Sequence, residues 1–397
     1  MNNAIYNFEL PKNELVNHYQ PGSHQRKQLM QALDQQASET IDIPLIIGGK
    51  EIQTKNKGIL RMPHNHKHIL ASYSIAGQTE IEMAAKAAVK ARQNWMSLSW
   101  LDRASVFLKA AEMISEKYRY KMNAATMLGQ SKSAYQAEID SACEVIDFLR
   151  FNAYYASEIY SKQPVSEFGN LNRLEYRSLE GFILAITPFN FTAIASNLNA
   201  APALMGNTLV WKPASTSVLS NYYLMKIFME AGLPDGVINF IPSSGRDISA
   251  VALKNKHLAG IHFTGSTSTF NHLWRATGEN LGNYISYPKL IGETGGKDFI
   301  LVHQSANFEE VGTAIIRGAF EYQGQKCSAA SRAYIPASMW PKLKPYLIER
   351  INDIKMGDVR DFSNFMNAVI DEASYLSIMD YIQYAEQSAE ATILAGG

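Results

Sequence analysis

Cys327 lies among residues that suit a reactive thiol. Gly324 gives the backbone before it conformational freedom, Lys326 supplies a neighbouring cation, and Ser328 is polar. A cysteine nucleophile is activated as its thiolate, which a nearby cation favours. Inert packing is the alternative, because a lone cysteine among small apolar residues is most often buried and unreactive. The other cysteine, Cys143, lies in the middle of an expected helix, and we assign it to packing.

Glu293 and Asn190 could complete a site around such a thiol. Glu293 stands in a glycine-rich run, residues 291–297. It could take a proton from hydrolytic water as a general base, or be a turn carboxylate that faces water. Asn190 lies where an expected strand meets a helix, so its amide could donate to a developing oxyanion or cap the helix. A thiol, a carboxylate base and an oxyanion donor together could oxidise an aldehyde through a covalent thioester.

Two further motifs suit a nucleotide. Lys212 ends an expected strand, and the carboxyl ends of parallel strands are where an open sheet binds nucleotides. A solvated strand-end lysine is the alternative. Gly265 and Ser266 open a helix directly after a strand, where free N–H groups suit a pyrophosphate, although other helix starts look similar. No Gly-x-Gly-x-x-Gly motif occurs, so the usual dinucleotide fingerprint is lacking.

The elements that must position these residues alternate after residue 181. We expect strands at 181–187, 208–212, 237–241, 259–264 and 285–290, with helices at 192–205, 218–231, 247–254 and 267–281. A helix at 308–322 and a strand at 333–336 flank the cysteine. Such alternation predicts an α/β fold, in which helices cover both faces of a parallel sheet.

The chain before residue 181 shows other patterns. Residues 1–40 form an extended or helical lead-in, residues 41–52 a hairpin around a Gly-Gly turn, and residues 79–154 a series of helices. Alternating residues around Pro164 and Gly169 indicate a projecting hairpin at 162–177.

Composition excludes several classes of protein. The 397 residues suggest two or three domains, and Lys+Arg and Asp+Glu both number 37, so no net field attracts nucleic acid or a membrane. Two cysteines cannot form a disulfide framework. Residues 1–10 show neither a secretory nor a transit-peptide pattern, and the longest apolar runs are too short to span a membrane. We therefore expect a cytoplasmic protein.

His64, His66 and His68 alternate without an acidic or cysteine partner nearby, and we expect no metal there.

In this order, the motifs resemble the aldehyde dehydrogenase superfamily over the whole chain. The general marks are Pro188-Phe-Asn190, Trp211-Lys-Pro213, Phe263-Thr-Gly-Ser266, Glu293-Thr-Gly-Gly296 and Gly324-Gln-Lys-Cys327. Longer stretches are similar to its 1-pyrroline-5-carboxylate dehydrogenase branch: Phe148-Leu-Arg-Phe-Asn152, Pro188-Phe-Asn-Phe-Thr-Ala193, Ala200-Ala-Pro-Ala-Leu-Met-Gly-Asn207, Ala319-Phe-Glu-Tyr322 and Gln325-Lys-Cys-Ser-Ala329.

The resemblance implies an NAD-dependent oxidation of L-glutamate γ-semialdehyde to L-glutamate in proline catabolism. Cys327 would attack the aldehyde, Asn190 and the Cys327 N–H would hold the oxyanion, and Glu293 would activate the hydrolytic water. The cofactor contacts would be Ile186, Thr187, Pro188, Phe189, Lys212, Ser215, Gly265, Ser266 and Glu293. The substrate contacts would be Ser328, Phe191 and Glu144. NADP stays open, because Lys212 and Ser215 could accommodate a 2′-phosphate.

For Glu144 the helical spacing agrees with a place near the substrate mouth, since Asp140, Glu144 and Phe148 share one face. A buried or charge-paired carboxylate is an equal alternative.

The resemblance also implies a domain plan. A Rossmann-like parallel-sheet cofactor domain would comprise residues 41–161 and 178–292, after the lead-in at 1–40. The hairpin at 162–177 would be an arm for homo-oligomer formation, and residues 293–397 would be the catalytic domain.

The chain departs from the family pattern in three places. Gly265-Ser-Thr-Ser-Thr-Phe270 replaces the usual Gly-Ser-Thr-x-x-Gly, and Gln323 stands where the branch often has glycine. The family's later Glu-Glu-Ile-Phe-Gly-Pro segment, its substrate-carboxylate loop and its C-terminal strand do not occur before Gly397. We therefore expect a truncated catalytic domain with exposed apolar surface, weak or no activity and a tendency to aggregate.

Two alternative functions remain. The chain could be a dehydrogenase for another semialdehyde, or a non-catalytic fragment that binds a nucleotide through residues 181–290.

Overall fold

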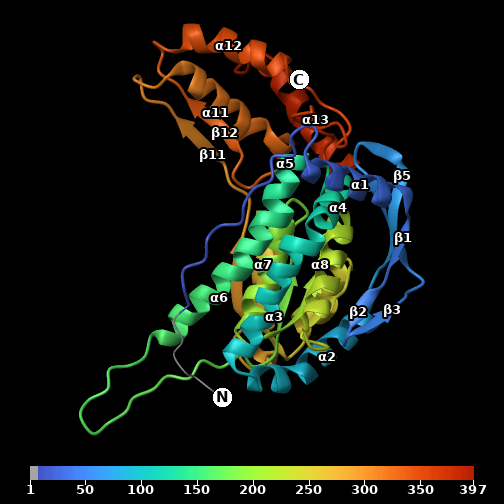
Figure 1. Ribbon diagram of the computed structural model, residues 1–397, viewed down its shortest axis with the longest axis vertical. Coiled ribbons are helices and arrows are strands. Elements are labelled where there is room, and N and C mark those ends of the chain that lie inside the picture. The colour runs from blue at the N-terminus through green and yellow to red at the C-terminus, as the bar shows by residue number, and fades with distance from the viewer. Residues whose placement is uncertain (1–7) are drawn as a thin grey trace.

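The computed structural model describes residues 8–397 (Figure 1). Residues 8–293 form a large body around a central sheet, and residues 294–397 form a smaller lobe at one end, called the small lobe below. Residues 162–177 project from the other end of the body. Of the expected lead-in, residues 1–7 lie outside the described part, residues 8–20 are without regular structure, and helix α1 covers His24–Ser38.

The central sheet confirms the predicted α/β fold. Within the described residues its strand order is β10-β9-β6-β7-β8-β2-β3. The parallel strands are β6 (Phe182–Ile186), β7 (Thr208–Lys212), β8 (Ile238–Phe240), β9 (Leu258–Thr264) and β10 (Lys289–Glu293). The predicted hairpin adds β2 (Leu45–Ile47) and β3 (Lys50–Ile52) in antiparallel pairing. Its turn needs positive φ at Gly48 (58°) and Gly49 (77°), which glycine adopts without strain.

Helices bury apolar side chains against both faces of this sheet, as a parallel sheet requires. One face is covered by α2 (Gln78–Ser97), α9 (Gly245–Val251), η4 (Ala252–Lys254) and α10 (Thr267–Glu279). The other is covered by α3 (Trp100–Met113), α4 (Arg119–Gln130), α6 (Val145–Ser161), α7 (Thr192–Leu204) and α8 (Val218–Ala231). Short pieces connect them: α5 (Ala134–Ala137), η3 (Ser215–Ser217) and η5 (Leu281–Asn283).

The helical region 79–154 is confirmed, with two turns of wider π geometry that the spacing does not predict. These are η1 (Ile114–Tyr118) and η2 (Glu138–Glu144). A second sheet, also unpredicted, joins β1 (Ile41–Ile43), β5 (Asn65–Ser74) and β4 (Lys57–Met62) in that order.

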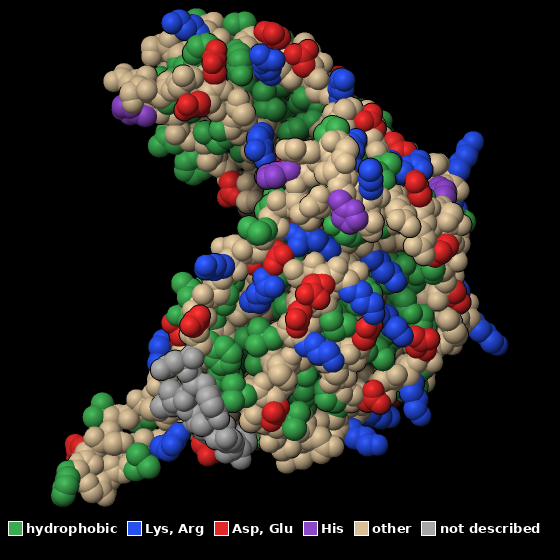
Figure 2. All heavy atoms as spheres, viewed as in Figure 1, with side chains coloured by type: hydrophobic (Ala, Val, Ile, Leu, Met, Phe, Trp, Pro, Cys, Tyr) green, Lys and Arg blue, Asp and Glu red, His purple; other side chains and the backbone are tan. Residues whose placement is uncertain are grey.

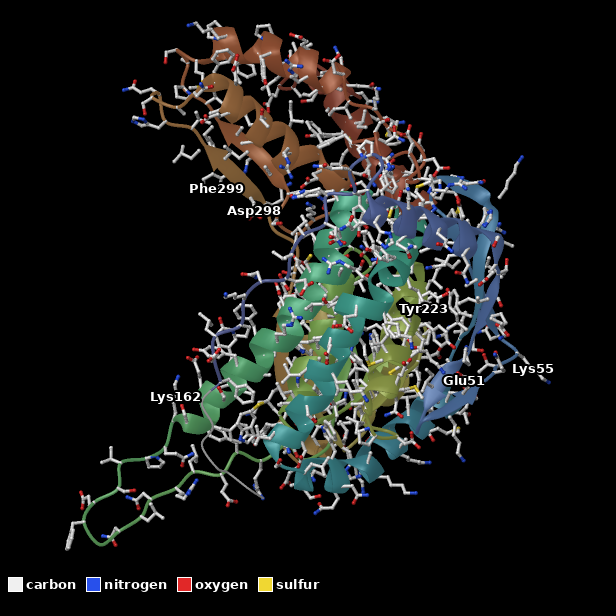
Figure 3. All side chains as sticks on the ribbon, in the orientation of Figure 1. Glu51, Lys55, Lys162, Tyr223, Asp298 and Phe299 are labelled. Carbon is white, nitrogen blue, oxygen red and sulfur yellow. The ribbon has the colours of Figure 1, made fainter. Side chains whose placement is uncertain are left out.

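The small lobe is built on a parallel pair of strands, β11 (Asp298–Leu301) and β12 (Ala330–Tyr334). Its helices are α11 (Phe308–Phe320), η6 (Glu321–Gly324), α12 (Trp340–Asn352) and α13 (Glu372–Gln387). Its buried cluster comprises Val302, Met339, Leu343 and Leu347. Many other apolar side chains of the lobe stay exposed, among them Leu301 and Phe299 on β11. Figure 3 labels Phe299.

Two predicted strands are wrong in their bounds. The strand expected at 285–290 is β10, Lys289–Glu293, because Pro288 has no N–H to give to a ladder and β10 begins after it. The strand expected at 333–336 is β12, Ala330–Tyr334. The start of this strand was missed because Ser331 and Arg332 are polar and interrupt the apolar pattern.

The projecting hairpin, called the arm below, lacks a regular ladder. Only the bridge between Glu167 and Asn170 is formed among its residues. Side-chain oxygens accept the backbone hydrogen bonds instead. Asn172 N donates to Ser166 Oγ (3.0 Å), and Leu174 N donates to Gln163 Oε1 (2.9 Å). The arm is therefore an extended loop that begins where α6 ends, at Lys162 (Figure 3).

Within residues 8–397, no helix is both long and apolar enough to span a membrane.

Candidate active site

Residues 321–328, called the cysteine loop below, carry Cys327 between α11 and β12. Tyr322 and Gln323 both have positive φ, 55° and 56°, which costs a residue with a Cβ about 1 kcal/mol. The buried Tyr322 hydroxyl compensates by donating to Gln130 O at 2.9 Å. At Gln323, where the family branch often has glycine, the backbone is thus in the region that glycine adopts most readily.

The Gln323 amide links the loop to both neighbouring segments. Its Nε2 donates to Ser131 O (3.1 Å) and to Ala368 O (2.8 Å), and its Oε1 accepts from Asn367 N (3.0 Å). The departure at residue 323 therefore supplies contacts that a glycine could not make.

The Cys327 thiol is half-buried. Burial raises its pKa above the ordinary value, and the negative charge of Glu293 raises it further. Hydrogen bonds from the N–H groups of Cys327 and Ser328 act in the opposite direction. The resting cysteine is therefore mainly a neutral thiol, with two N–H donors directed at its sulfur and Ser328 exposed beside it.

Glu293 is the last residue of β10, not a turn residue after the strand. Its exposed carboxylate accepts a long hydrogen bond from Thr264 Oγ1 at 3.5 Å, and its carbonyl accepts from Gly265 N at 3.1 Å. The glycines after it bring the backbone to the nucleophile, since a Cβ on Gly296 would come within 2.7 Å of the Cys327 carbonyl oxygen. Close approach thus requires glycine at 296.

Asn190 directs its side-chain amide at the cysteine loop. Nδ2 donates to Gln325 O at 3.0 Å, two residues before the nucleophile. The interpretation of Asn190 as an N-cap is wrong. The N-cap residue of α7 is Phe191, whose side chain makes no capping hydrogen bond. The Asp140 carboxylate takes this role by accepting from Thr192 N (3.1 Å) and Ala193 N (2.9 Å).

Sequence reasoning missed the buried ion pair beneath this site. Lys132 Nζ lies 2.7 Å from Asp140 Oδ2, and both side chains are almost completely buried. Nothing in the eight-residue spacing indicates the pairing. The one available signal is that Asp140 shares a helix face with Glu144.

Glu144 lies at the end of η2 and is half-buried. Burial, followed by the charge of Asp140, raises the pKa of its carboxyl to about 7, although Lys132 and Lys326 lower it. Glu144 is therefore partly desolvated and lies among charges, which agrees with the alternative of a buried or charge-paired carboxylate. Its place near the substrate stays a prediction. The ring of Phe191, the other expected substrate contact on this side, has Lys132 Nζ 4.0 Å from its centroid.

The expected cofactor residues gather at the carboxyl end of the parallel sheet. Ile186 and Lys212 line a pocket of about 390 Å³ with residues of α9 and α10: Gly245, Arg246, Ile248, Ser249, Thr269, His272 and Leu273. Burial lowers the pKa of the Lys212 ammonium. Among the described residues it has no hydrogen-bond or ion-pair partner, so the pocket holds a cation that a polar ligand could engage.

The remaining cofactor candidates lie around this end of the sheet but outside that pocket. Thr187 Oγ1 accepts from Trp211 Nε1 (3.0 Å) and Phe189 O accepts from Gln130 Nε2 (2.7 Å), so both are used in packing the strand end. Pro188 stands between them. Exposed Ser266 caps α10 by accepting from Thr269 N at 3.2 Å, directly after Gly265.

Ser215 is exposed at the start of η3.

The surface carries no field of one sign. Acidic and basic side chains are interspersed over the face shown in Figure 2, in agreement with the formal net charge of zero. The same view shows a hollow between the small lobe and the body. Among the described residues, no group of three or more His, Cys, Asp or Glu side chains could hold a metal ion.

Comparisons with known proteins agree on one family. The model of the aldehyde dehydrogenase family matches residues 52–397. The mitochondrial delta-1-pyrroline-5-carboxylate dehydrogenase of Dictyostelium discoideum is 48% identical over 397 residues, which are 99% of this chain and 71% of that protein. The human mitochondrial protein of that name is 45% identical over 386 residues, 97% of this chain and 69% of its own.

Solved structures give the same result. The delta-pyrroline-5-carboxylate dehydrogenase of Mycobacterium tuberculosis, bound with NAD, superposes with a TM-score of 0.97 at 47% identity. The match covers 99% of this chain and 74% of that one. A Thermus 1-pyrroline-5-carboxylate dehydrogenase with bound NAD has a TM-score of 0.90 at 28% identity, covering 96% and 73%.

Proposed function

Because the chain belongs to the aldehyde dehydrogenase family, we propose that it oxidises L-glutamate γ-semialdehyde, the open form of 1-pyrroline-5-carboxylate, to L-glutamate. NAD would accept the hydride, and the reaction would be a step of proline breakdown. The observation that carries the proposal is the meeting of Asn190 with the cysteine loop, where Glu293 also acts on the Cys327 thiol.

In this mechanism, Cys327 forms a bond from its sulfur to the aldehyde carbon, after the thiol has lost its proton. The carbonyl oxygen becomes an oxyanion, which the Asn190 amide and the Cys327 N–H stabilise. Removing one such donor typically costs about 3 kcal/mol of barrier. Bound NAD supplies the hydride acceptor that turns this adduct into a thioester. Glu293 then takes a proton from water, the water attacks the thioester carbon, and glutamate leaves as the thiolate is restored.

The residues at the sheet's carboxyl end fit NAD. The pocket beside Lys212 offers a half-buried cation and apolar walls from Ile186 and Leu273, which suit an adenosine. The N-terminus of α10 after Gly265 and Ser266 suits a pyrophosphate. Lys212 would hold the ribose, and the strand end 186–189 would orient the rest of the cofactor toward Cys327.

Turnover of 1-pyrroline-5-carboxylate, followed by NADH absorbance, tests the assignment. Any NADH that the chain produces should depend on the thiol, so the Cys327→Ala variant should produce none. Cys143→Ala is the matched control, because the buried Cys143 thiol contacts Arg119 and Leu15 O, so its removal should leave turnover in place. The predicted weak activity of this chain stays a prediction, which the same assay measures. Oxidation of a different semialdehyde would contradict the substrate assigned here, and NAD binding without turnover would favour the non-catalytic alternative.

We also propose that the protein is cytoplasmic and self-associates through the arm. Val165, Phe168 and Leu171 are 84%, 107% and 79% exposed there, and such side chains are usually covered by a partner. Light scattering of the wild type and of Phe168→Glu checks the association, which the variant should weaken. Cell fractionation checks the location, since several relatives are named as mitochondrial.

A further inference from the structure

Lys132 lies between the two halves of the candidate active site. Its side chain is completely buried, and its Nζ lies 2.7 Å from Asp140 Oδ2. The same ammonium lies 4.0 Å from the ring centroid of Phe191 and 4.6 Å from that of Tyr322. One cation therefore contacts the segment that carries Asn190 and the loop that carries Cys327.

On the Asn190 side, the contact runs through Asp140. Its two oxygens accept the N–H groups of Thr192 and Ala193, at 3.1 and 2.9 Å, and these are the first residues of α7. The positive end of the helix and the Lys132 ammonium thus share one buried carboxylate. Asn190 lies two residues before this fixed point, so the place of α7 determines where its amide points.

On the Cys327 side, the contact runs through Tyr322. Its ring faces the Lys132 ammonium, and its hydroxyl donates to Gln130 O at 2.9 Å, two residues before Lys132. Tyr322 is five residues before the nucleophile and has a left-handed backbone that needs tertiary contacts to persist. The junction between α4 and α5 thereby holds the cysteine loop from beneath.

A lysine in such a place must keep its partners. Burial lowers the pKa of Lys132, and the charge and hydrogen bond of Asp140 act against this shift. The other charged groups that act on it are Glu144 on η2 and Lys326 in the cysteine loop. A buried ion pair often adds little net stability relative to apolar residues of the same size, but it specifies one arrangement of its surroundings in some proteins.

We propose that Lys132 is a positioning residue, which sets the Asn190 amide relative to the Cys327 thiol by binding the start of α7 through Asp140 and the cysteine loop through Tyr322. This inference rests on the proposed function only in assigning Asn190 to the oxyanion. The geometry that it explains is independent of the aldehyde that the protein oxidises.

The test uses the double variant Lys132→Met with Asp140→Asn. Lys132→Met alone leaves Asp140 buried without its cation and can fail to fold. The double variant removes both charges, while the asparagine oxygen can still accept from α7. Lys226→Met is the matched control, because it removes a lysine from an exposed ion pair with Glu51, away from the site.

Hydrolysis of p-nitrophenyl acetate without cofactor measures acyl transfer to Cys327. We expect the double variant to lose about 10- to 100-fold in ester turnover per folded molecule, since displacement of a reacting group by about 1 Å can cost this much. Its affinity for NAD should match the wild type, because the Lys212 pocket lies at another part of the sheet end. If Lys132 only stabilised the fold, the double variant would have a lower melting temperature but the same ester turnover per folded molecule.

Amide hydrogen exchange supplies a second readout that needs no substrate. Exchange should rise in residues 190–193 and 322–328 of the double variant but not in the central strands, and Lys226→Met should change neither. Wild-type ester turnover together with wild-type exchange in both segments would overturn the proposal. Failure of the proposed function appears separately, as an unmodified protein that hydrolyses the ester but does not oxidise 1-pyrroline-5-carboxylate.

Discussion

The reactivity of Cys327 depends on which charges act on its sulfur. Burial and the Glu293 carboxylate both favour the neutral thiol, against two N–H groups that favour the thiolate. The charge of the proposed general base thus disfavours the thiolate form of the nucleophile beside it. Glu293 should therefore influence the first chemical step as well as the hydrolysis of the thioester.

Glu293→Gln should make the Cys327 thiol more acidic. Removal of a negative charge lowers the free energy of the thiolate, so the pKa of the thiol falls and alkylation begins at lower pH. The rate of iodoacetamide reaction against pH measures this, and Glu349→Gln on the exposed face of α12 is the control. A midpoint that stays in place or rises would show that the Glu293 charge does not act on the sulfur.

Glu144→Gln should stabilise the protein in mildly alkaline solution. Burial raises the pKa of Glu144 from 4.5 to about 7, so the folded state holds a proton that the unfolded state has released between these values. The wild type therefore loses stability as pH rises through this window, by no more than about 3 kcal/mol and by less where water screens the group.

Urea unfolding near pH 5 and near pH 8 checks this. The free energy of unfolding of the variant should exceed that of the wild type only at the higher pH. An equal difference at both values would contradict the raised pKa and point to a change in packing.

The sequence predicts the reacting side chains better than it predicts their support. Cys327, Glu293 and Asn190 each stand in a local motif, and the structure brings their segments together. Lys132 and Asp140 stand in no motif, because their pairing depends on how η2 packs against the junction between α4 and α5, which no local pattern marks. Substrate and cofactor roles for these side chains remain predictions.

At the scale of elements, the backbone after β10 controls the approach to the nucleophile. Gly295 and Gly296 are adjacent but differ in their surroundings. A Cβ on Gly296 would meet the Cys327 carbonyl oxygen at 2.7 Å, whereas nothing lies within 4 Å of one on Gly295.

Gly296→Ala should therefore displace the cysteine loop, and Gly295→Ala should not. The obstacle is a backbone atom that cannot rotate away, so a shift of the loop is required. We expect Gly296→Ala to change the alkylation rate of Cys327 several-fold and to lower the melting temperature, with Gly295→Ala as the matched control. Equal behaviour of the two variants would mean that the loop adapts without cost.

Predictability of the elements follows the length and regularity of each pattern. The helices α7 and α8 and the strand β7 lie where alternation places them, because their buried faces are continuous. The hairpin β4–β5 and the π turn η2 were not predicted, since the former has exposed polar positions and the latter differs from an α-helix by one hydrogen-bond register. The arm was predicted as a hairpin, but its backbone bonds to side chains instead.

At the scale of the whole molecule, the small lobe has little core of its own. Only Val302, Met339, Leu343 and Leu347 are fully buried in its cluster, and the apolar side chains around them are only partly buried, so contacts with the body must contribute to its order. One attachment is the cysteine loop, through Tyr322, Gln323 and Gln325. Another is the segment around Asp358 and Phe362. Asp358 Oδ1 lies 3.4 Å from His64 Nε2, and the centroid of the Phe362 ring lies 4.7 Å from the Arg26 guanidinium carbon.

Catalytic geometry and attachment of the lobe therefore use the same hydrogen bonds. Tyr322→Phe should loosen the lobe, because it leaves Gln130 O without its buried donor at a cost of about 1–3 kcal/mol. Exchange of lobe amides that open through detachment should then accelerate by roughly 5- to 100-fold, while the central sheet keeps its protection.

Tyr346→Phe is the control within the same lobe. The Tyr346 ring packs edge-on against Phe308, and its hydroxyl makes no hydrogen bond to the described residues. Hydrogen exchange followed by mass spectrometry, with peptides from β11, α11 and α12, compares the two variants. If both leave lobe exchange at the wild-type rate, the Tyr322 hydroxyl does not help to hold the lobe. If only Tyr322→Phe accelerates it, the loop that carries the nucleophile also joins the two parts of the molecule, and the order of the small lobe and the position of Cys327 depend on one another.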